Sequence, residues 1–430
     1  MRGPVILTTM DFDQPWTLEN YLKIGGYQAL RKVLTEKTPP DVIIAEVKAS
    51  ALRGRGGAGF PTGLKWSFVP RTSPKPKYIM VNADESEPGT CKDRLLIEFD
   101  PHQLIEGMMI AGLAVGSQTG YIYIRGEYRY LIDIMDRAID EAYARGYLGK
   151  NIQGAGVTFD VRTHTGAGAY ECGEESALME SFEGKRGVPR IRPPFPAVAG
   201  VYQCPTVLNN VETFCAVPSI ILMGGANWAG LGTPKNGGTR FFCLSGHINN
   251  PGVYELPMGF NLMRMINEVG GGMRGGKKLK AVIPGGSSCP VLKADECDVA
   301  MDYDSVAAIK SMLGSGGVVV MDEDTCMVKA AQRIMKFYAH ESCGWCIPCR
   351  EGTTWLKKML DRFHAGGGRR EEIKLIGDLS KNILGRTFCP LGDAAAMPTI
   401  AFVEKFYDDF AAHLDGKPCP YEAKSRLVTA

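Results

Sequence analysis

The stretch Glu341-Ser-Cys-Gly-Trp-Cys-Ile-Pro-Cys-Arg-Glu351 decides how the C-terminal part of the chain folds. It places Cys343, Cys346 and Cys349 at two successive three-residue steps, and Cys389 follows 40 residues after the third thiol. A 4Fe–4S cluster binds four Cys thiolates, and a short turn can bring the first three to adjacent irons. In two-cluster ferredoxins the next Cys comes four residues later, where this chain has Thr353. The spacing therefore predicts one 4Fe–4S cluster with Cys389 as its distant fourth ligand.

Two other interpretations of these thiols remain open on spacing alone. Structural zinc usually takes two separated ligand pairs, often with His, and His340 is close enough in sequence to be a fourth ligand. The thiols could also be inert buried side chains.

The composition is that of a soluble globular protein with two or three domains. The chain has 430 residues, of which 45% are hydrophobic and 22% charged. A net charge of +2 gives no indication of nucleic-acid or membrane-surface binding. Thirteen Cys without a secretory signal predict a reducing, cytoplasmic compartment. No stretch approaches 18 uncharged apolar residues, and residues 104–115 are expected to form a buried helix.

A Gly-rich loop follows a predicted helical region over residues 17–52, in which Asp41 is expected to cap a helix. Residues 53–63 contain five Gly and match the pattern Gly-x-Gly-x-x-Gly. The dinucleotide fingerprint needs a preceding strand, so an ordinary Rossmann site is not predicted. Bare backbone amides with Arg53 and Arg55 suit a flat anionic cofactor, although a purely structural turn is the alternative.

Strands and helices alternate after this loop. Strands are predicted over residues 78–82, 121–125 and 157–163, with helices over 93–117 and 128–145, which indicates a parallel α/β sheet. The first strand runs into Asp84, Glu85 and Glu87, and the third into a second Gly-rich stretch at residues 166–175. Polar residues at the carboxyl ends of strands predict a shared ligand cleft, with a solvated loop as the alternative.

The remainder divides into two further parts. Residues 190–196 are predicted to be extended. Asn209 and Asn210 follow at the start of a predicted helix that runs to about Met223. They are expected either to bind a phosphate or to serve as plain helix caps. Strands are predicted over 241–245, 252–256, 279–283 and 317–321, a helix over 261–269, and helices from about 325 onward, including 353–364, 370–384 and 396–414. The predicted domains are residues 1–238, 239–325 and 326–430.

Residues 53–68, 82–94, 166–178, 192–197, 209–213 and 341–351 together resemble the flavin-bearing subunit of NADH:quinone oxidoreductase, respiratory complex I. The resemblance extends over almost the whole chain in the family's order. It implies an α/β flavin domain that is not a Rossmann fold, a β-grasp (ubiquitin-like) domain and a C-terminal four-helix bundle with a 4Fe–4S cluster. It also implies that NADH is oxidised by hydride transfer to FMN, and that electrons pass singly to the cluster and through partner subunits towards quinone.

The resemblance also assigns roles to matching positions, none of them an acid or base catalyst. It implies FMN contacts at Gly54, Arg55, Gly56, Lys65, Asn82, Asp84, Glu85, Tyr170, Gly173, Glu174, Asn209, Asn210 and Thr213. It implies NADH contacts at Phe60, Phe68, Glu87, Glu175 and Phe195, and cluster ligation by Cys343, Cys346, Cys349 and Cys389.

Two positions depart from the family pattern, and a third, Glu175, carries a testable expectation. Glu171 replaces an aliphatic residue, where a carboxylate would lower the flavin potential or hinder the dinucleotide, and Cys91 replaces an aromatic one. Glu175 is expected near the adenosine 2′-hydroxyl, where it would repel the 2′-phosphate of NADPH.

The expected partners are a 2Fe–2S thioredoxin-like subunit and a large multi-cluster iron–sulfur subunit of the same complex. The expected location is cytoplasmic, on the inner face of the bacterial inner membrane through those partners. One alternative is the related diaphorase subunit of a soluble NAD-linked hydrogenase or formate dehydrogenase. Another is a zinc-stabilised binding module without catalysis.

Overall fold

The computed structural model describes residues 5–421, which form two compact units. The first holds residues 5–86, 91–242 and 253–259; the second holds 87–90, 243–252 and 260–421. Among the described residues, no helix combines the length and the apolar character needed to cross a bilayer.

The first unit is built on a parallel sheet, as the alternation of strands and helices predicts. Its strands are β1 (Tyr78–Ala83), β2 (Thr119–Ile124), β3 (Asp160–Thr165) and β4 (Thr206–Asn210). Their order is β3-β2-β1-β4, and every pair is parallel. Strand β4 was not predicted, because its five residues lie directly against the predicted start of the next helix.

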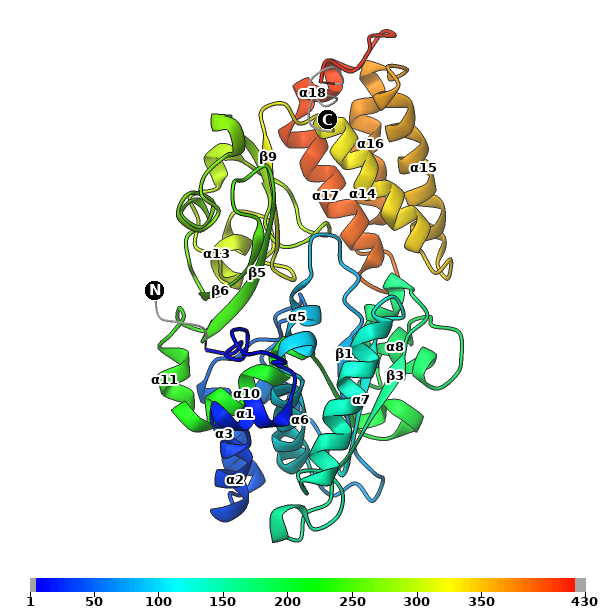
Figure 1. The fold of residues 1–430 in the computed structure, drawn as a ribbon. Coiled ribbons are helices and arrows are strands. Elements are labelled where there is room, and N and C mark those ends of the chain that lie inside the picture. The colour runs from blue at the N-terminus through cyan, green and yellow to red at the C-terminus, as the bar shows by residue number, and fades with distance from the viewer. Residues whose placement is uncertain (1–4, 422–430) are drawn as a thin grey trace. The chain divides into compact units, whose positions relative to one another are not determined.

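Helices α5 (Lys92–Phe99), α6 (Pro101–Val115), α7 (Arg129–Ala144) and α10 (Val211–Met223) connect or follow the strands of this sheet (Figure 1). The prediction of a buried helix over residues 104–115 is confirmed, because nearly all of α6 is buried. A Cβ at Gly107 would lie 2.0 Å from the carbonyl oxygen of Phe214. Glycine at this position therefore lets α6 and α10 pack backbone to backbone.

The N-terminal helical region consists of α1 (Leu18–Lys23), α2 (Gln28–Thr35) and α3 (Pro40–Ala49). The prediction that Asp41 caps a helix is wrong. Proline is favoured at the first helical position, and Pro40 occupies it, so that the cap position falls on Pro39. Asp41 lies in the first turn, where its carboxylate pairs with Arg71.

The second unit begins with most of a mixed sheet of order β6-β5-β9-β7-β8. The strands are β5 (Thr239–Gly246), β6 (Gly252–Pro257), β7 (Leu279–Ile283), β8 (Leu292–Lys293) and β9 (Gly317–Asp322). Strand β9 is parallel to β5 and antiparallel to β7. The predicted helix near residue 261 is a short α12 (Leu262–Arg264) continued by a π-helical turn, and α13 (Tyr303–Ala308) was not predicted.

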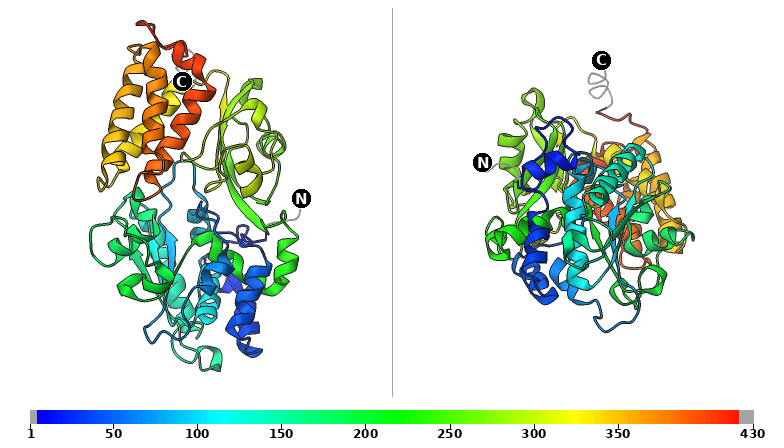
Figure 2. Two further views of the ribbon diagram at one scale, coloured as in Figure 1. Left: turned by 180° about the vertical axis from the view of Figure 1, so that it is seen from behind. Right: turned by 60° about the horizontal axis from the view of Figure 1, so that its bottom comes forward.

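The C-terminal part of the second unit is helical, as predicted. It contains α14 (Met327–Glu341), α15 (Ile347–His364), α16 (Arg370–Ile383), α17 (Leu391–Lys405) and the short α18 (Tyr407–Ala411). The four long helices lie side by side in opposite views (Figures 1 and 2). Helix α15 begins six residues before the predicted 353, so Cys349 lies in its first turn.

Candidate functional site

Polar residues gather in the first unit where the strand order of the sheet reverses. The chain leaves β1 towards β2 on one side, and β4 later pairs with β1 on the other side. Asn82 near the end of β1 is the register partner of Asn210 at the end of β4. Open α/β sheets bind ligands outside the carboxyl ends of strands at such a switch point. The predicted location of a ligand site at this edge is thus consistent with the observed topology.

The Gly-rich loop over residues 53–61 lies against the start of α10, beside this edge. It follows helix α3 rather than a strand, as predicted, and leads into α4 (Thr62–Ser67). The backbone amide of Arg55 donates to Thr213 Oγ1 at 2.9 Å, and a Cβ at Gly56 would lie 3.3 Å from Asn210 Cβ. These contacts bring the first and last segments of the expected FMN site together.

Two glycines of the site have no structural need to be glycine within the protein. Gly54 and Gly173 do not have positive φ, and an added Cβ would make only ordinary contacts, the nearest at 3.5 Å in each case. Glycine is otherwise required where a ligand approaches the backbone closely. Both positions therefore fit a flat group lying against the chain, such as a flavin.

A buried charge network supports the segments of the site that hold Arg55 and Asn210. Glu212 lies 2.8 Å from Lys92 Nζ and 3.8 Å from the Arg55 guanidinium, and all three side chains are almost fully buried. Asp93 pairs with Lys92 at 2.7 Å and accepts from the Asn210 amide at 2.6 Å. Burial alone would lower the pKa of Lys92, but Asp93 and Glu212 outweigh it and raise that pKa.

Lys92, Asp93 and Glu212 were not predicted from the sequence as supporting residues. Each lies within a segment that carries the resemblance, so the signal was present in the sequence. The pairing itself joins the start of α5 to the start of α10, about 120 positions apart, and no local pattern indicates it.

The third segment of the expected site is the turn before α8 (Glu175–Phe182). The Asn82 side-chain amide donates to the Gly173 carbonyl at 2.8 Å, which ties this turn to the end of β1. Glu174 caps α8 by accepting from the amides of Ser176 and Ala177, both at 2.9 Å. Tyr170 begins the 3-10 turn that precedes this cap.

Two carboxylates and two cations form a chain of ion pairs beside this turn. Arg192 donates to Glu174 and to Glu175, each at 2.7 Å, and Lys65 donates to Glu175 at 3.0 Å. These side chains remain partly exposed, by 11–28%. Lys65 and Glu175, predicted to contact different ligands, are therefore direct neighbours.

Asp84, Glu85 and Asn209 are turned towards protein groups. Asp84 accepts from the Ser86 hydroxyl at 2.8 Å, and Asn209 accepts from the Trp66 indole N–H at 2.9 Å. The Glu85 carboxylate accepts from the amides of Asp93 and Arg94 at 2.8 and 3.1 Å. Burial raises the pKa of Glu85 to about 8, with Asp93 adding to this effect.

The two departures from the family pattern lie in different surroundings. Glu171 is 3% exposed and lies within the second Gly-rich stretch, in the same 3-10 turn as Gly173, whose carbonyl accepts from Asn82. Cys91 is half-buried at the cap position of α5, next to Lys92 of the charge network.

The aromatic residues expected to contact NADH are exposed. Phe60, Phe68 and Phe195 are 46%, 51% and 58% exposed. The Phe60 and Phe68 rings have centroids 6.1 Å apart, and in sequence Phe60 precedes α4 while Phe68 follows it. Glu87 belongs to the second unit, where its carboxylate accepts from the Ser288 amide at 2.7 Å.

Three of the four Cys residues of the predicted cluster occupy two adjoining loops of the second unit, and Cys349 lies in the first turn of α15. Cys343 and Cys346 lie in the loop between α14 and α15, which turns at Gly344 with a φ of +75°. Cys389 lies in the loop between α16 and α17, and the two loops meet where Trp345 and Phe388 have centroids 6.4 Å apart. Three thiols in two touching loops, with Cys349 in the first turn of α15, fit the donor set of a 4Fe–4S cluster.

The surroundings of these thiols argue against the zinc alternative that used His340. Cys349 and Cys389 are buried, and Cys343 and Cys346 are half-buried. The His340 side chain is 84% exposed and lies 3.8 Å from Glu341.

Comparison with known families finds matches to three parts of the chain. Residues 47–219 match the Nuo51 FMN-binding domain, residues 240–320 an SLBB domain, and residues 329–413 the NADH-ubiquinone oxidoreductase-F iron-sulfur binding region. The chain is therefore a flavin- and iron–sulfur-binding protein with a parallel-sheet flavin domain, an SLBB domain and a helical C-terminal iron–sulfur region.

Full-length relatives give the family. The chain is 54% identical over 421 residues to an F subunit (number 2) of the NADH-quinone oxidoreductase of Rhizobium meliloti (strain 1021), covering 98% of this chain and 100% of the relative. It is 49% identical to the F subunit of the Mycobacterium bovis enzyme, covering 99% and 97%. The chain belongs to the family of NADH-quinone oxidoreductase F subunits, and the predicted family is confirmed.

A solved structure with a similar fold comes from another enzyme. A chain of an NAD+-reducing NiFe hydrogenase in the H2-reduced state superimposes with a TM-score of 0.81 and 34% identity. The match covers all of this chain and 71% of the hydrogenase chain.

Proposed function

We propose that this chain is the NADH-oxidising subunit of respiratory complex I. The observation that carries the proposal is that one chain of this family combines an FMN-binding domain with a 4Fe–4S binding region. Bound FMN supplies the conversion of a two-electron hydride transfer into single-electron steps towards the cluster. The residues of the chain have to bind and orient FMN and NADH and shield them from solvent, and none needs to act as an acid or base.

The FMN site is assigned to the switch-point edge of the parallel sheet. The Gly-rich loop would receive the flavin at Gly54 and Gly56, while Asn209, Asn210 and Thr213 would lie near its phosphate. The Lys92–Glu212 ion pair supports this assignment, because it joins the start of α5 to the start of α10 and both of its side chains are fully buried. Asn82, Asp84, Tyr170, Gly173 and Glu174 would hold the ring and the ribityl chain, with Glu85 fixing the start of α5 behind them.

The NADH site is assigned to the exposed side of the same edge. Phe60 and Phe68 offer exposed rings on which an adenine can stack, and Phe195 adds a third. Lys65 would place positive charge close to the ring system, and Glu175 would contact the dinucleotide hydroxyls. The family pattern alone predicts a further NADH contact at Glu87.

The cluster is assigned to Cys343, Cys346, Cys349 and Cys389. Two of these thiols are partly accessible, which suits electron exit towards a partner. The partners would be a 2Fe–2S thioredoxin-like subunit and a large multi-cluster subunit, at the cytoplasmic face of the bacterial inner membrane. The chain would fold as domains 1–238, 239–325 (β-grasp) and 326–430 (four-helix bundle).

A soluble diaphorase is the second candidate, because the hydrogenase chain shares the fold over this entire chain. The higher identity and reciprocal coverage of the quinone oxidoreductase relatives favour complex I.

The test is an anaerobic NADH titration of the purified, cofactor-loaded chain, followed by absorbance and paramagnetic resonance. We expect the flavin to bleach and a cluster signal to develop with NADH. A chain that is purified with neither flavin nor iron, or that is not reduced by NADH, would refute the proposal.

A further inference from the structure

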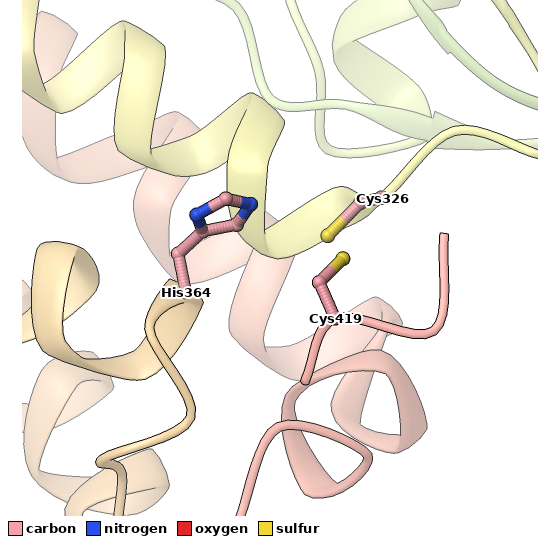
Figure 3. Close-up of side chains that lie close together, drawn as sticks. All are labelled: Cys326, His364 and Cys419. Carbon is pink, nitrogen blue, oxygen red and sulfur yellow. The ribbon is translucent and has the colours of Figure 1, made fainter. Parts of the chain in front are cut away.

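A second group of potential metal ligands lies in the helical part of the second unit, outside the four-Cys array. One ligand atom from each of Cys326, His364 and Cys419 lies within 4.8 Å of the other two. Both Cys residues are buried and His364 is half-buried. Figure 3 shows the two sulfurs facing each other with the imidazole beside them. Nothing in the FMN or iron–sulfur assignment uses these residues.

The backbone holds these three residues close together by its own hydrogen bonds. Cys326 is the cap residue of α14, and His364 is the last residue of α15. Past His364, the Gly366 carbonyl accepts from the Gly416 amide at 2.9 Å, and a β-bridge joins Gly368 to Leu414. The segment that carries Cys419 therefore runs alongside the end of α15.

His413 provides a fourth donor atom. Its Nδ1 lies 2.7 Å from the Asp409 carbonyl oxygen, which can only accept, so Nδ1 carries the proton. The lone pair is then on Nε2, which lies 3.4 Å from Cys326 Sγ. A backbone carbonyl that fixes the tautomer in this way is the usual second partner of a metal-binding imidazole. His413 is itself fully buried.

We propose that Cys326, His364, His413 and Cys419 bind one structural Zn²⁺ ion. Two thiolates and two imidazoles are a preferred tetrahedral zinc set, with Zn–S about 2.3 Å and Zn–N about 2.0 Å. These bond lengths place neighbouring S and N ligands about 3.5 Å apart on a tetrahedron, and Cys326 and His413 are 3.4 Å apart. Two thiolates also neutralise the ion, so the buried site carries no net charge.

A single ion fits this spacing better than a mixed iron–sulfur cluster. In a two-iron centre with two Cys and two His, the imidazoles bind one iron and the thiolates the other. Here a His364 nitrogen lies within 4.8 Å of both sulfurs and His413 Nε2 lies 3.4 Å from Cys326 Sγ, so the imidazoles and the thiolates are not separated into two pairs. The ion would join the start of α14, the end of α15 and the segment after α18.

The first test is metal analysis of the full-length, cofactor-loaded chain, purified without metal-affinity chromatography. We expect about one zinc per chain beside about four irons, and loss of most of the zinc in Cys419→Ser and His364→Ala with iron and FMN retained. Cys297→Ser is the matched control, because that buried thiol donates to the Lys293 carbonyl and lies outside the group. Wild-type protein without zinc, or variants that keep a full zinc content, would overturn the proposal.

A second measurement does not depend on the variants folding. X-ray absorption at the zinc edge of the wild-type chain should show two sulfur and two imidazole nitrogen ligands. A spectrum with four sulfurs, which would place zinc in the other Cys array, contradicts the proposal. A Cys326–Cys419 disulfide in protein isolated with alkylation of free thiols also contradicts it.

Discussion

Replacing Glu175 with alanine should change the choice between NADH and NADPH. The Glu175 carboxylate is paired with Lys65 at 3.0 Å and with Arg192 at 2.7 Å, and Arg192 also binds Glu174. These two cations and two anions sum to zero net charge. Glu175→Ala leaves a net charge of +1 at the edge of the proposed dinucleotide site, where a 2′-phosphate would now be attracted.

The size of the effect follows from the charge and the exposure of the group. A unit charge about 5 Å away interacts by about 1 kcal/mol in water and by about 3 kcal/mol at an effective dielectric constant of about 20. The side chains are 22–28% exposed, so solvent and salt screen part of this energy. A gain of about 1.4 kcal/mol for NADPH corresponds to about a tenfold rise in its kcat/KM relative to that of NADH.

The assay is steady-state reduction of ferricyanide with each dinucleotide at two salt concentrations. The NADPH to NADH ratio of kcat/KM should rise in Glu175→Ala, and the rise should shrink at high salt. Glu180→Ala is the control, because that carboxylate on the same helix pairs with Arg190 instead. An unchanged ratio in Glu175→Ala, or an equal rise in the control, would refute the assignment of Glu175 to the dinucleotide site.

Three further results are expected. Glu212→Gln removes the buried partner of Lys92 and Arg55, so denaturant titration should show a loss of about 3–5 kcal/mol together with weaker FMN binding; wild-type stability would contradict the network's role. Burial raises the pKa of Glu85 to about 8, so the folded chain retains a proton that the unfolded chain releases near its ordinary pKa. The free energy of unfolding should therefore fall from about pH 5 to about pH 8, less steeply in Glu85→Gln, and an equal slope in both proteins would argue against this proton. Phe60→Ala and Phe68→Ala remove exposed rings and should each raise KM for NADH by about five- to tenfold, for about 1 kcal/mol of stacking, with stability unchanged; unaltered KM would exclude stacking there.

The sequence was most informative where the pattern is local. Alternating strands and helices predicted the parallel sheet, and the two polar stretches indicated its carboxyl edge correctly. Three Cys residues at three-residue steps predicted an iron–sulfur region that the family comparison confirms. Individual ligand contacts stay predictions.

Two local features were predicted wrongly or missed: Pro40 takes the first helical position, so Asp41 is not the cap, and strand β4 runs directly into its helix. Features that join distant parts of the chain could not be predicted. The Lys92–Glu212 pair and the group of Cys326, His364 and Cys419 each join segments tens of residues apart. Only the folded backbone brings such side chains together, so no spacing rule applies to them.

The most direct test of the central claim is NADH reduction of a Cys389→Ser variant, followed by paramagnetic resonance and by absorbance of the flavin. If NADH reduces the flavin and Cys389 holds the cluster that takes its electrons, the flavin should still bleach while the cluster signal is lost or altered and electron transfer beyond the flavin slows. A cluster of unchanged spectrum and iron content, reduced at the wild-type rate, would contradict the account.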